Sequence, residues 1–191
     1  GVDLLAPTRS ALLIDLDNDG DQDLVLATTQ QVLLLENDGS GRFTLRATRS
    51  CSSLLYSMTA ADFDNDGDQD ILFVNSRRWP WDSRGEKQAA GLALYQNDGS
   101  GRFQDVTAGS GLDDVFYGMG VAAGDFDNDG DIDVFVSNLN DTPTLLRPDG
   151  DSRRNWLMVQ VVGTRSNRDA VGTRLRLVAA GRSQWRTISG A

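Results

Sequence analysis

Short apolar runs alternate with acidic, glycine-containing loops along most of the chain. Three runs, at 24–26, 71–74 and 134–136, each follow such a loop directly, and two others, at 32–35 and 92–95, lead into an Asn-Asp-Gly turn. Apolar runs of this length between turn residues predict buried strands joined by hairpins. No stretch of useful length has the 3.6-residue apolar period of a helix. The pattern therefore predicts an all-β fold.

The order of these elements repeats. Nearly identical nine-residue segments, Asp15–Asp23, Asp62–Asp70 and Asp125–Asp133, each precede an apolar run, and Asn-Asp-Gly-Ser-Gly-Arg-Phe occurs at 37–43 and again at 97–103. The repeat unit is about 45 residues long, which is typical of solenoids, propellers and arrays. If the three repeats are β-propeller-type blades, they form an incomplete ring, because even the smallest propellers need about four blades.

The end of the chain differs in charge and pattern. Residues 1–151 contain 27 acidic and 10 basic side chains, whereas residues 152–191 contain eight arginines and one acidic residue, Asp169. Opposite signs of this kind indicate a domain boundary, placed here near residue 151, or two surfaces that attract one another. Alternating apolar positions at 157–161 and 171–177, with a third run at 183–188, predict a small antiparallel β domain with one arginine-bearing face.

Composition excludes several functions. The chain has no histidine and a single cysteine, Cys51, so a Ser/His/Asp relay, a histidine-ligated zinc site and an internal disulfide are ruled out. The net charge of −10 argues against a nucleic-acid partner, which requires a basic surface. No apolar run approaches the length of a membrane span. We expect no enzyme; the alternative is a carbohydrate-active propeller enzyme, a lyase or hydrolase that uses a carboxylate, Tyr56 or Tyr117 beside bound Ca²⁺.

The acidic loops carry the candidate chemistry. In each copy aspartates occupy positions 1, 3, 5, 7 and 9, and glycine occupies position 6. Oxygen ligands on a tightly turned loop suit Ca²⁺, and five carboxylates on nine residues repel one another unless a cation holds them. An EF-hand is excluded, because its position-12 glutamate is replaced by Leu26, Phe73 and Val136. Position 7 is expected to offer its backbone carbonyl more than its side chain, and position 9 to close the coordination.

The fifteen candidate ligands form three calcium sites. They are Asp15, Asp17, Asp19, Asp21, Asp23, Asp62, Asp64, Asp66, Asp68, Asp70, Asp125, Asp127, Asp129, Asp131 and Asp133.

These loops and the segment after them resemble known families. The Asp-x-Asp-x-Asp-Gly-x-x-Asp loops within residues 10–150 resemble the FG-GAP (VCBS) repeats of integrin-α-type β-propellers, and residues 155–177 resemble the ASPIC/UnbV domain of cartilage-acidic-protein-like proteins. The resemblance implies that positions 1, 3, 5 and 9 of each loop are side-chain ligands and that position 7 gives a carbonyl. It also implies an extracellular module, secreted or at the cell surface, that acts in adhesion or structural assembly through protein or glycan contacts.

Family propellers usually have about seven blades, so the chain is expected to be a fragment or a subunit whose open edges are covered by neighbours. The second case would make it a self-assembling subunit of an extracellular filament or matrix.

An insertion between the second and third loops is a candidate partner contact. Trp79 and Trp81 flank Pro80, and Arg77 and Arg78 precede them. Aromatic side chains beside arginines suit protein or glycan recognition. The alternative is that both tryptophans cover the core of a blade. Asn140 lies in an Asn-Asp-Thr glycosylation pattern, and Cys51 is expected to be a small buried residue or to form an intermolecular disulfide.

Overall fold

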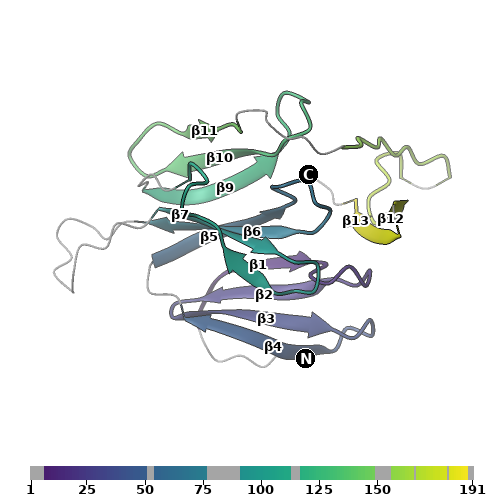
Figure 1. Cartoon of the computed structure of the whole chain (residues 1–191), viewed down its shortest axis with the longest axis horizontal. Helices are drawn as coiled ribbons and strands as arrows, with labels where there is room; N and C mark the ends of the chain where they lie inside the picture. The colour runs from purple at the N-terminus through teal and green to yellow at the C-terminus, as the bar shows by residue number, and fades with distance from the viewer. Residues whose placement is uncertain are drawn as a thin grey trace.

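The computed structural model describes residues 7–50, 54–76, 91–112, 117–148, 156–165, 167–179 and 181–188, and these residues form thirteen strands and no helix (Figure 1). The predicted all-β class is confirmed. With no helix in the described part of the chain, nothing there could cross a membrane as a helical span.

Three antiparallel sheets are stacked face to face, and each corresponds to one sequence repeat (Figure 1). The first follows the order β1-β2-β3-β4, with bounds Thr8–Ile14, Asp23–Thr28, Gln31–Asn37 and Phe43–Ser50. The second follows the order β5-β6-β7-β8, with bounds Leu54–Ala61, Asp70–Ser76, Leu92–Asn97 and Phe103–Asp105. The third joins β9 (Gly118–Gly124), β10 (Asp133–Asn138) and β11 (Thr144–Leu146). The three described sheets do not close into a ring.

Each acidic loop joins the first two strands of its blade. The residue before position 1 pairs with position 9 across the two strands: Ile14 with Asp23, Ala61 with Asp70, and Gly124 with Asp133. The same residue pair therefore closes each acidic loop, and equivalent loop positions have equivalent places relative to the strands in all three blades.

Apolar side chains hold the blades together. Ile71 and Phe73 of β6 pack toward the first blade, whereas Leu72 and Val74 pack toward the third. Because both faces of β6 are buried, its sequence is a continuous apolar run and not an alternating one. Strand β9 comes so close to β6 that a Cβ at Gly118 would overlap Val74.

Hydrogen bonds between neighbouring acidic loops add to this packing. The position-4 asparagine of each of the first two loops donates its amide to the position-7 aspartate of the next loop. Asn18 Nδ2 lies 2.6 Å from Asp68 Oδ1, and Asn65 Nδ2 lies 3.0 Å from Asp131 Oδ1 and 3.2 Å from the carbonyl of Gly130. The loops therefore act as joints between blades.

The end of the chain differs from its prediction. Residues 156–163 form no strand, and Leu157, Met158 and Val159 are more than half exposed, so the strand predicted at 157–161 is wrong. Alternating apolar residues make a strand only where a second surface covers them, and no described segment does so here. Strands β12 (Arg174–Ala179) and β13 (Arg182–Thr187) form a two-stranded hairpin, which confirms the third predicted run and places the second a few residues later. The predicted boundary at 151 lies outside the described residues.

Replacing Asn65 by alanine should destabilise the fold more than the same change at Asn128. Both asparagines have a left-handed backbone, with φ of 56° and 61°, so the conformational cost is matched. Of these two asparagines, only Asn65 bonds a neighbouring loop in the described part of the chain. We expect a difference of about 1–2 kcal/mol in the free energy of unfolding, measured by urea denaturation. Equal losses in the two variants would show that the amide bonds do not join the blades.

Candidate metal centre

The backbone of each acidic loop is bent at the same two positions. Position 4 is an asparagine with φ of 58°, 56° and 61° in the three copies, and position 6 is a glycine, with φ of 101° at Gly67. Asparagine and glycine are the residues that adopt this left-handed conformation at least cost. The bends turn alternate side chains toward the inside of the loop.

Nine of the fifteen predicted ligands converge in three clusters. Within each cluster, one carboxylate oxygen from every member lies within 4.8 Å of the others. The members are Asp15, Asp17 and Asp19; Asp62, Asp64 and Asp66; and Asp125, Asp127 and Asp133. The first two clusters use positions 1, 3 and 5, and the third uses positions 1, 3 and 9.

Several of these oxygens are buried without a protein donor. In the described structure Asp15 Oδ1, Asp17 Oδ1 and Asp133 Oδ1 are inaccessible to solvent and have no hydrogen-bond partner. A buried carboxylate oxygen in that condition costs free energy unless a cation or donor compensates it. The oxygens therefore fit a bound hard cation, for which carboxylates are the preferred ligands.

In the first two loops position 9 organises the backbone and lies outside the cluster. Asp23 accepts the amide N–H groups of Leu16 and Asn37 at 2.9 and 2.8 Å. Asp70 accepts the equivalent amides of Phe63 and Asn97 at 3.0 and 2.8 Å. These bonds tie each loop to the Asn-Asp-Gly turn of its own blade.

The third loop differs because of a proline. Asp133 accepts the amide of Phe126 at 2.8 Å, but Pro148 stands where the other blades have Asn37 and Asn97. Proline has no N–H, so the second donor is missing and Asp133 Oδ1 joins the cluster.

The position-7 side chains face other partners. Asp68 and Asp131 accept the asparagine amides of the preceding loops. Asp21 lies 3.7 Å from the guanidinium of Arg174 in the hairpin. Asp129, at position 5 of the third loop, accepts the amide of Asp131 at 2.9 Å. The position-7 carboxylates thus join their loops to neighbouring elements, whereas the Asp129 contact lies within its own loop.

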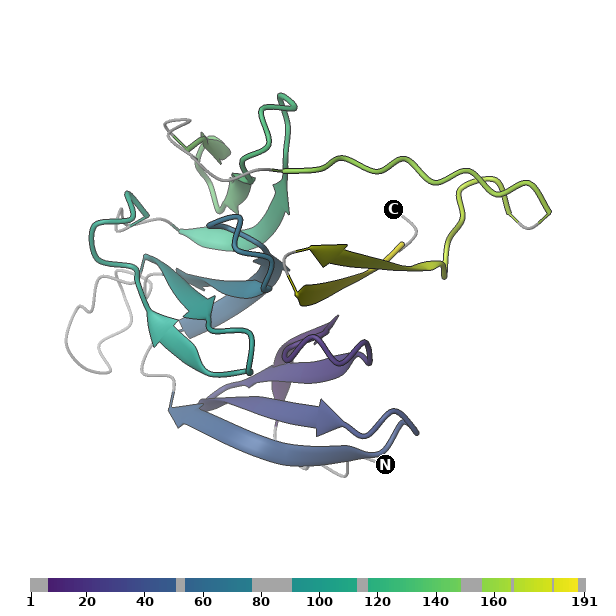
Figure 2. The same ribbon diagram turned by 45° about the vertical axis from the view of Figure 1, so that its right-hand side comes forward.

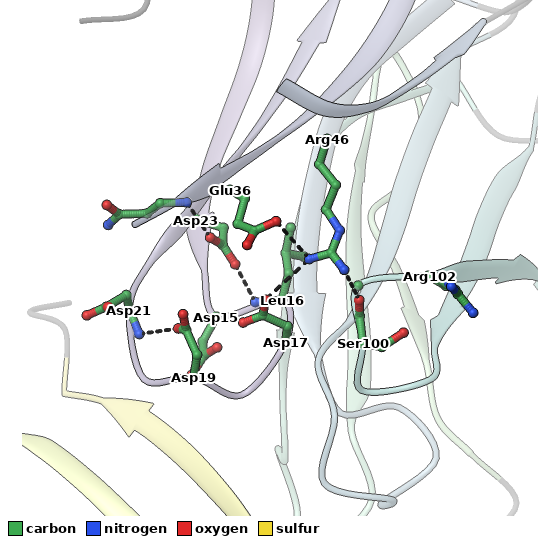
Figure 3. A network of polar contacts seen from close by, with 12 residues as sticks. Asp15, Leu16, Asp17, Asp19, Asp21, Asp23, Glu36, Arg46, Ser100 and Arg102 are labelled. Atoms are coloured by element: carbon green, nitrogen blue, oxygen red, sulfur yellow. Dashed lines mark hydrogen bonds and ion pairs between the residues drawn. The ribbon is translucent and has the colours of Figure 1, made fainter. Parts of the chain in front are cut away.

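Figure 3 shows the first cluster with its neighbouring cation. Arg46 of β4 lies 3.2 Å from Asp17 Oδ2 and also 3.2 Å from Glu36. It donates a further hydrogen bond to the carbonyl of Ser100 in the second blade. The guanidinium therefore links the cluster to the next blade, while Glu36 balances its charge.

The basic end of the chain covers the loops (Figure 2). A Cβ at Gly20, Gly67 or Gly130 would overlap Trp185, Gln184 or Trp156, respectively. The acidic and basic parts of the sequence thus meet, which is one of the two outcomes that their opposite charges predict.

The hairpin arginines contact the second loop. Arg186 lies 3.6 Å from Asp62 Oδ2 and donates to the carbonyl of Gly67 at 3.3 Å, and Arg182 donates to the carbonyl of Asp66 at 3.4 Å. These contacts place positive charge beside carboxylates and carbonyls that face the hairpin.

Burial raises the pKa of five carboxyls in the first two loops. Loss of hydration raises the pKa of Asp15 and Asp62 to about 6, and that of Asp70 to about 7, with neighbouring aspartates adding to the effect. The same loss of hydration raises the pKa of Asp23 and Asp68. These carboxyls of the first two loops therefore resist full ionisation without a cation.

Several important residues are absent from the fifteen candidates. Asn18 and Asn65 join the blades, and Arg46 and Arg147 contact position-3 carboxylates. The recurrence of asparagine at position 4 was a usable sequence signal, whereas the arginines are identified only by strand register. Trp79, Trp81, Arg77, Arg78 and Cys51 lie outside the described residues, and their roles stay predictions.

Comparison with known proteins supports the repeat interpretation. A family model described as FG-GAP-like repeat matches residues 15–73 and 82–136. Over 48 residues the chain is 46% identical to cartilage acidic protein 1 of Xenopus tropicalis, and 44% identical to the proteins of that name from Mus musculus and Homo sapiens. Each alignment covers 25% of this chain and 7% of the relative. The ASPIC/UnbV-like interpretation of residues 155–177 stays a prediction.

The metal-free chain should lose stability as the pH rises from about 5 to about 8. In the unfolded chain an aspartate has a pKa of about 3.9, so the raised values of Asp15, Asp62 and Asp70 mean that the folded chain keeps protons which the unfolded chain releases. This contribution is complete below about pH 4 and is lost as the pH rises through about 6–7. The test is thermal unfolding in EDTA at pH 5 and pH 8. Asp70→Asn should flatten the dependence, and a higher midpoint at pH 8 would contradict the assignment.

Proposed function

The chain belongs to the FG-GAP-like repeat family, and from that premise we propose that it is a calcium-binding, extracellular β-propeller-type module that acts in adhesion or structural assembly. Convergence of carboxylate oxygens in three clusters, with buried and unpartnered oxygens in the first and third, is the observation that carries the calcium assignment. Asp15, Asp17 and Asp19 in the first loop, and the clusters of the other two loops, would hold the ions, and position 7 would add a backbone carbonyl.

Calcium suits these loops better than magnesium. Ca²⁺ accepts 6–8 oxygen ligands at irregular angles, whereas Mg²⁺ requires a near-ideal octahedron. Each cluster offers three carboxylates from a single bent loop, a donor set that fits irregular coordination better than an octahedron and so favours the larger ion. Bound calcium supplies charge compensation here, and the proposal assigns no reaction to the chain.

The role of calcium in this proposal is to stabilise the blades. For a site with a dissociation constant about 100-fold below the free calcium concentration, binding adds about 2.7 kcal/mol to the free energy of unfolding. Because the loops are also joints between blades, this stabilisation acts on the packing of the sheets.

Family membership and the names of the relatives support an extracellular location. Millimolar calcium would keep even weak sites filled there. The partner in this proposal is a protein or a glycan. The aligned region is a small part of each relative, so the partner must be identified by binding experiments on this chain.

Calcium should raise the melting temperature in 2 mM CaCl₂ by more than about 10 °C relative to EDTA, because several sites each contribute a few kcal/mol. Asp64→Asn, which weakens the second cluster, should reduce this shift. Asp38→Asn is the matched control, since Asp38 is an exposed turn residue bonded to Ser40 and belongs to no cluster. An unchanged melting temperature in EDTA would overturn the calcium proposal, and an equal shift with magnesium would overturn the choice of ion.

A second candidate function, self-assembly into a filament or matrix, is favoured by one surface. Phe126, Phe135 and Leu145 of the third blade are 72%, 45% and 43% exposed, and apolar side chains of this size are usually covered by a partner. Sedimentation velocity at increasing concentration with calcium, and again with EDTA, tests it. Large species that dissolve in EDTA would support self-assembly, whereas a calcium-bound monomer at all concentrations would exclude it in favour of a heterologous partner.

A further inference from the structure

One strand position faces the acidic loop in every blade. The residues that pair across the second and third strands are Leu24 with Leu35, Ile71 with Tyr95, and Val134 with Leu146. The residue after each of these third-strand partners is therefore equivalent in the three blades, and in the third blade it lies directly after β11. It is Glu36 in the first blade, Gln96 in the second and Arg147 in the third.

Each of these residues is connected to the position-3 aspartate of its own loop. Gln96 donates its amide to Asp64, and Arg147 forms an ion pair with Asp127. Glu36 is connected to Asp17 through Arg46. The same strand position thus brings a negative charge, no charge or a positive charge to otherwise similar loops.

Arg147 contacts two of the three carboxylates in its cluster. Besides its ion pair with Asp127, its Nε atom lies 3.9 Å from Asp133 Oδ1. Asp133 is 3% exposed, and this oxygen has no hydrogen-bond partner in the described structure. A metal ion bound by the third cluster must therefore share its ligands with a guanidinium.

Among the contacts of the described residues, neither of the other two loops has an arginine that contacts two members of its cluster. Arg46 in the first blade is balanced by Glu36, which lies as close to it as Asp17 does. In the second blade the strand position is neutral, and Arg186 approaches a single cluster member, Asp62, from the hairpin. The ion pairs of Arg147 within the described residues are both with carboxylates of its own loop.

We propose that the guanidinium of Arg147 compensates the carboxylates of the third loop when no metal ion is bound. We propose further that it makes this loop bind calcium at least about tenfold more weakly than the first. The inference rests on the proposed function, because it presupposes calcium in the first two loops. A guanidinium beside the cluster repels a divalent ion and compensates the carboxylates in its absence. The third loop therefore keeps its folded form without metal, and the blades fill with calcium in sequence as the ion concentration rises.

The test is calorimetric titration of the full chain with CaCl₂. The wild type should show two tighter sites and one site at least about tenfold weaker. Arg147→Gln, which copies Gln96, should strengthen the weak site about tenfold. Asp127→Asn should remove the weak step and so assign it to the third loop. Arg102→Gln, which removes the same charge from an exposed turn, is the control and should change no site by more than about twofold.

Stability provides a second readout. In EDTA the Arg147→Gln variant should melt below the wild type, because the carboxylates of its third cluster have lost the guanidinium that compensates them. Addition of calcium should remove this difference in melting temperature. A variant that is unfolded in EDTA and folds in calcium supports the proposal equally. Three equal sites in the wild type, or unchanged binding in Arg147→Gln, would overturn the inference alone. Absence of calcium binding by every variant would instead overturn the proposed function.

Discussion

Carboxylates that are buried and close together must be compensated by positive charge or by hydrogen-bond donors, and the structure depends on how this is done. Asp23 and Asp70 use backbone amides, Asp68 and Asp131 use asparagine amides from the neighbouring loop, and Arg46 and Arg147 supply guanidinium groups. The oxygens left over, such as Asp15 Oδ1, point into the clusters. Calcium in our proposal completes a compensation that the protein provides only in part.

The same contacts connect the chemistry of the loops to the packing of the blades. Asn18 and Asn65 place one loop against the next, so a change in the charge of one cluster acts on a joint between two sheets. The apolar cores between the sheets give most of the cohesion, since burial of side chains such as Leu72 and Val136 is complete. The loops set how the sheets are aligned at one side of the stack. Calcium binding and blade packing are therefore expected to be cooperative.

Local features of the sequence were sufficient to predict the blades. The run of β6, the Asn-Asp-Gly turns and the acidic loops depend on neighbours along the chain, and the structure confirms the strands that they predict. Two features could not be predicted in this way. The segment 157–161 needed a covering surface to become a strand, and its sequence carries no information about that surface. Position 9 of the third loop joins the cluster, whereas position 9 of the other two loops accepts two backbone amides. This difference depends on which residue the strand register places beside position 9.

That last difference explains why three nearly identical loops are chemically unequal. The acidic segments keep their aspartates, and the variation lies at the end of the third strand of each blade. There the third blade has Arg147 and Pro148 in place of Glu36 and Asn37 of the first blade and Gln96 and Asn97 of the second. The proline removes the donor that would have satisfied Asp133, and the arginine before it brings a positive charge to within 3.9 Å of the same oxygen. The proline thus makes the negative charge of Asp133 less favourable, and the arginine makes it more favourable. Either replacement alone would change the electrostatic balance of the loop, whereas together they exchange a neutral backbone donor for a charged side chain.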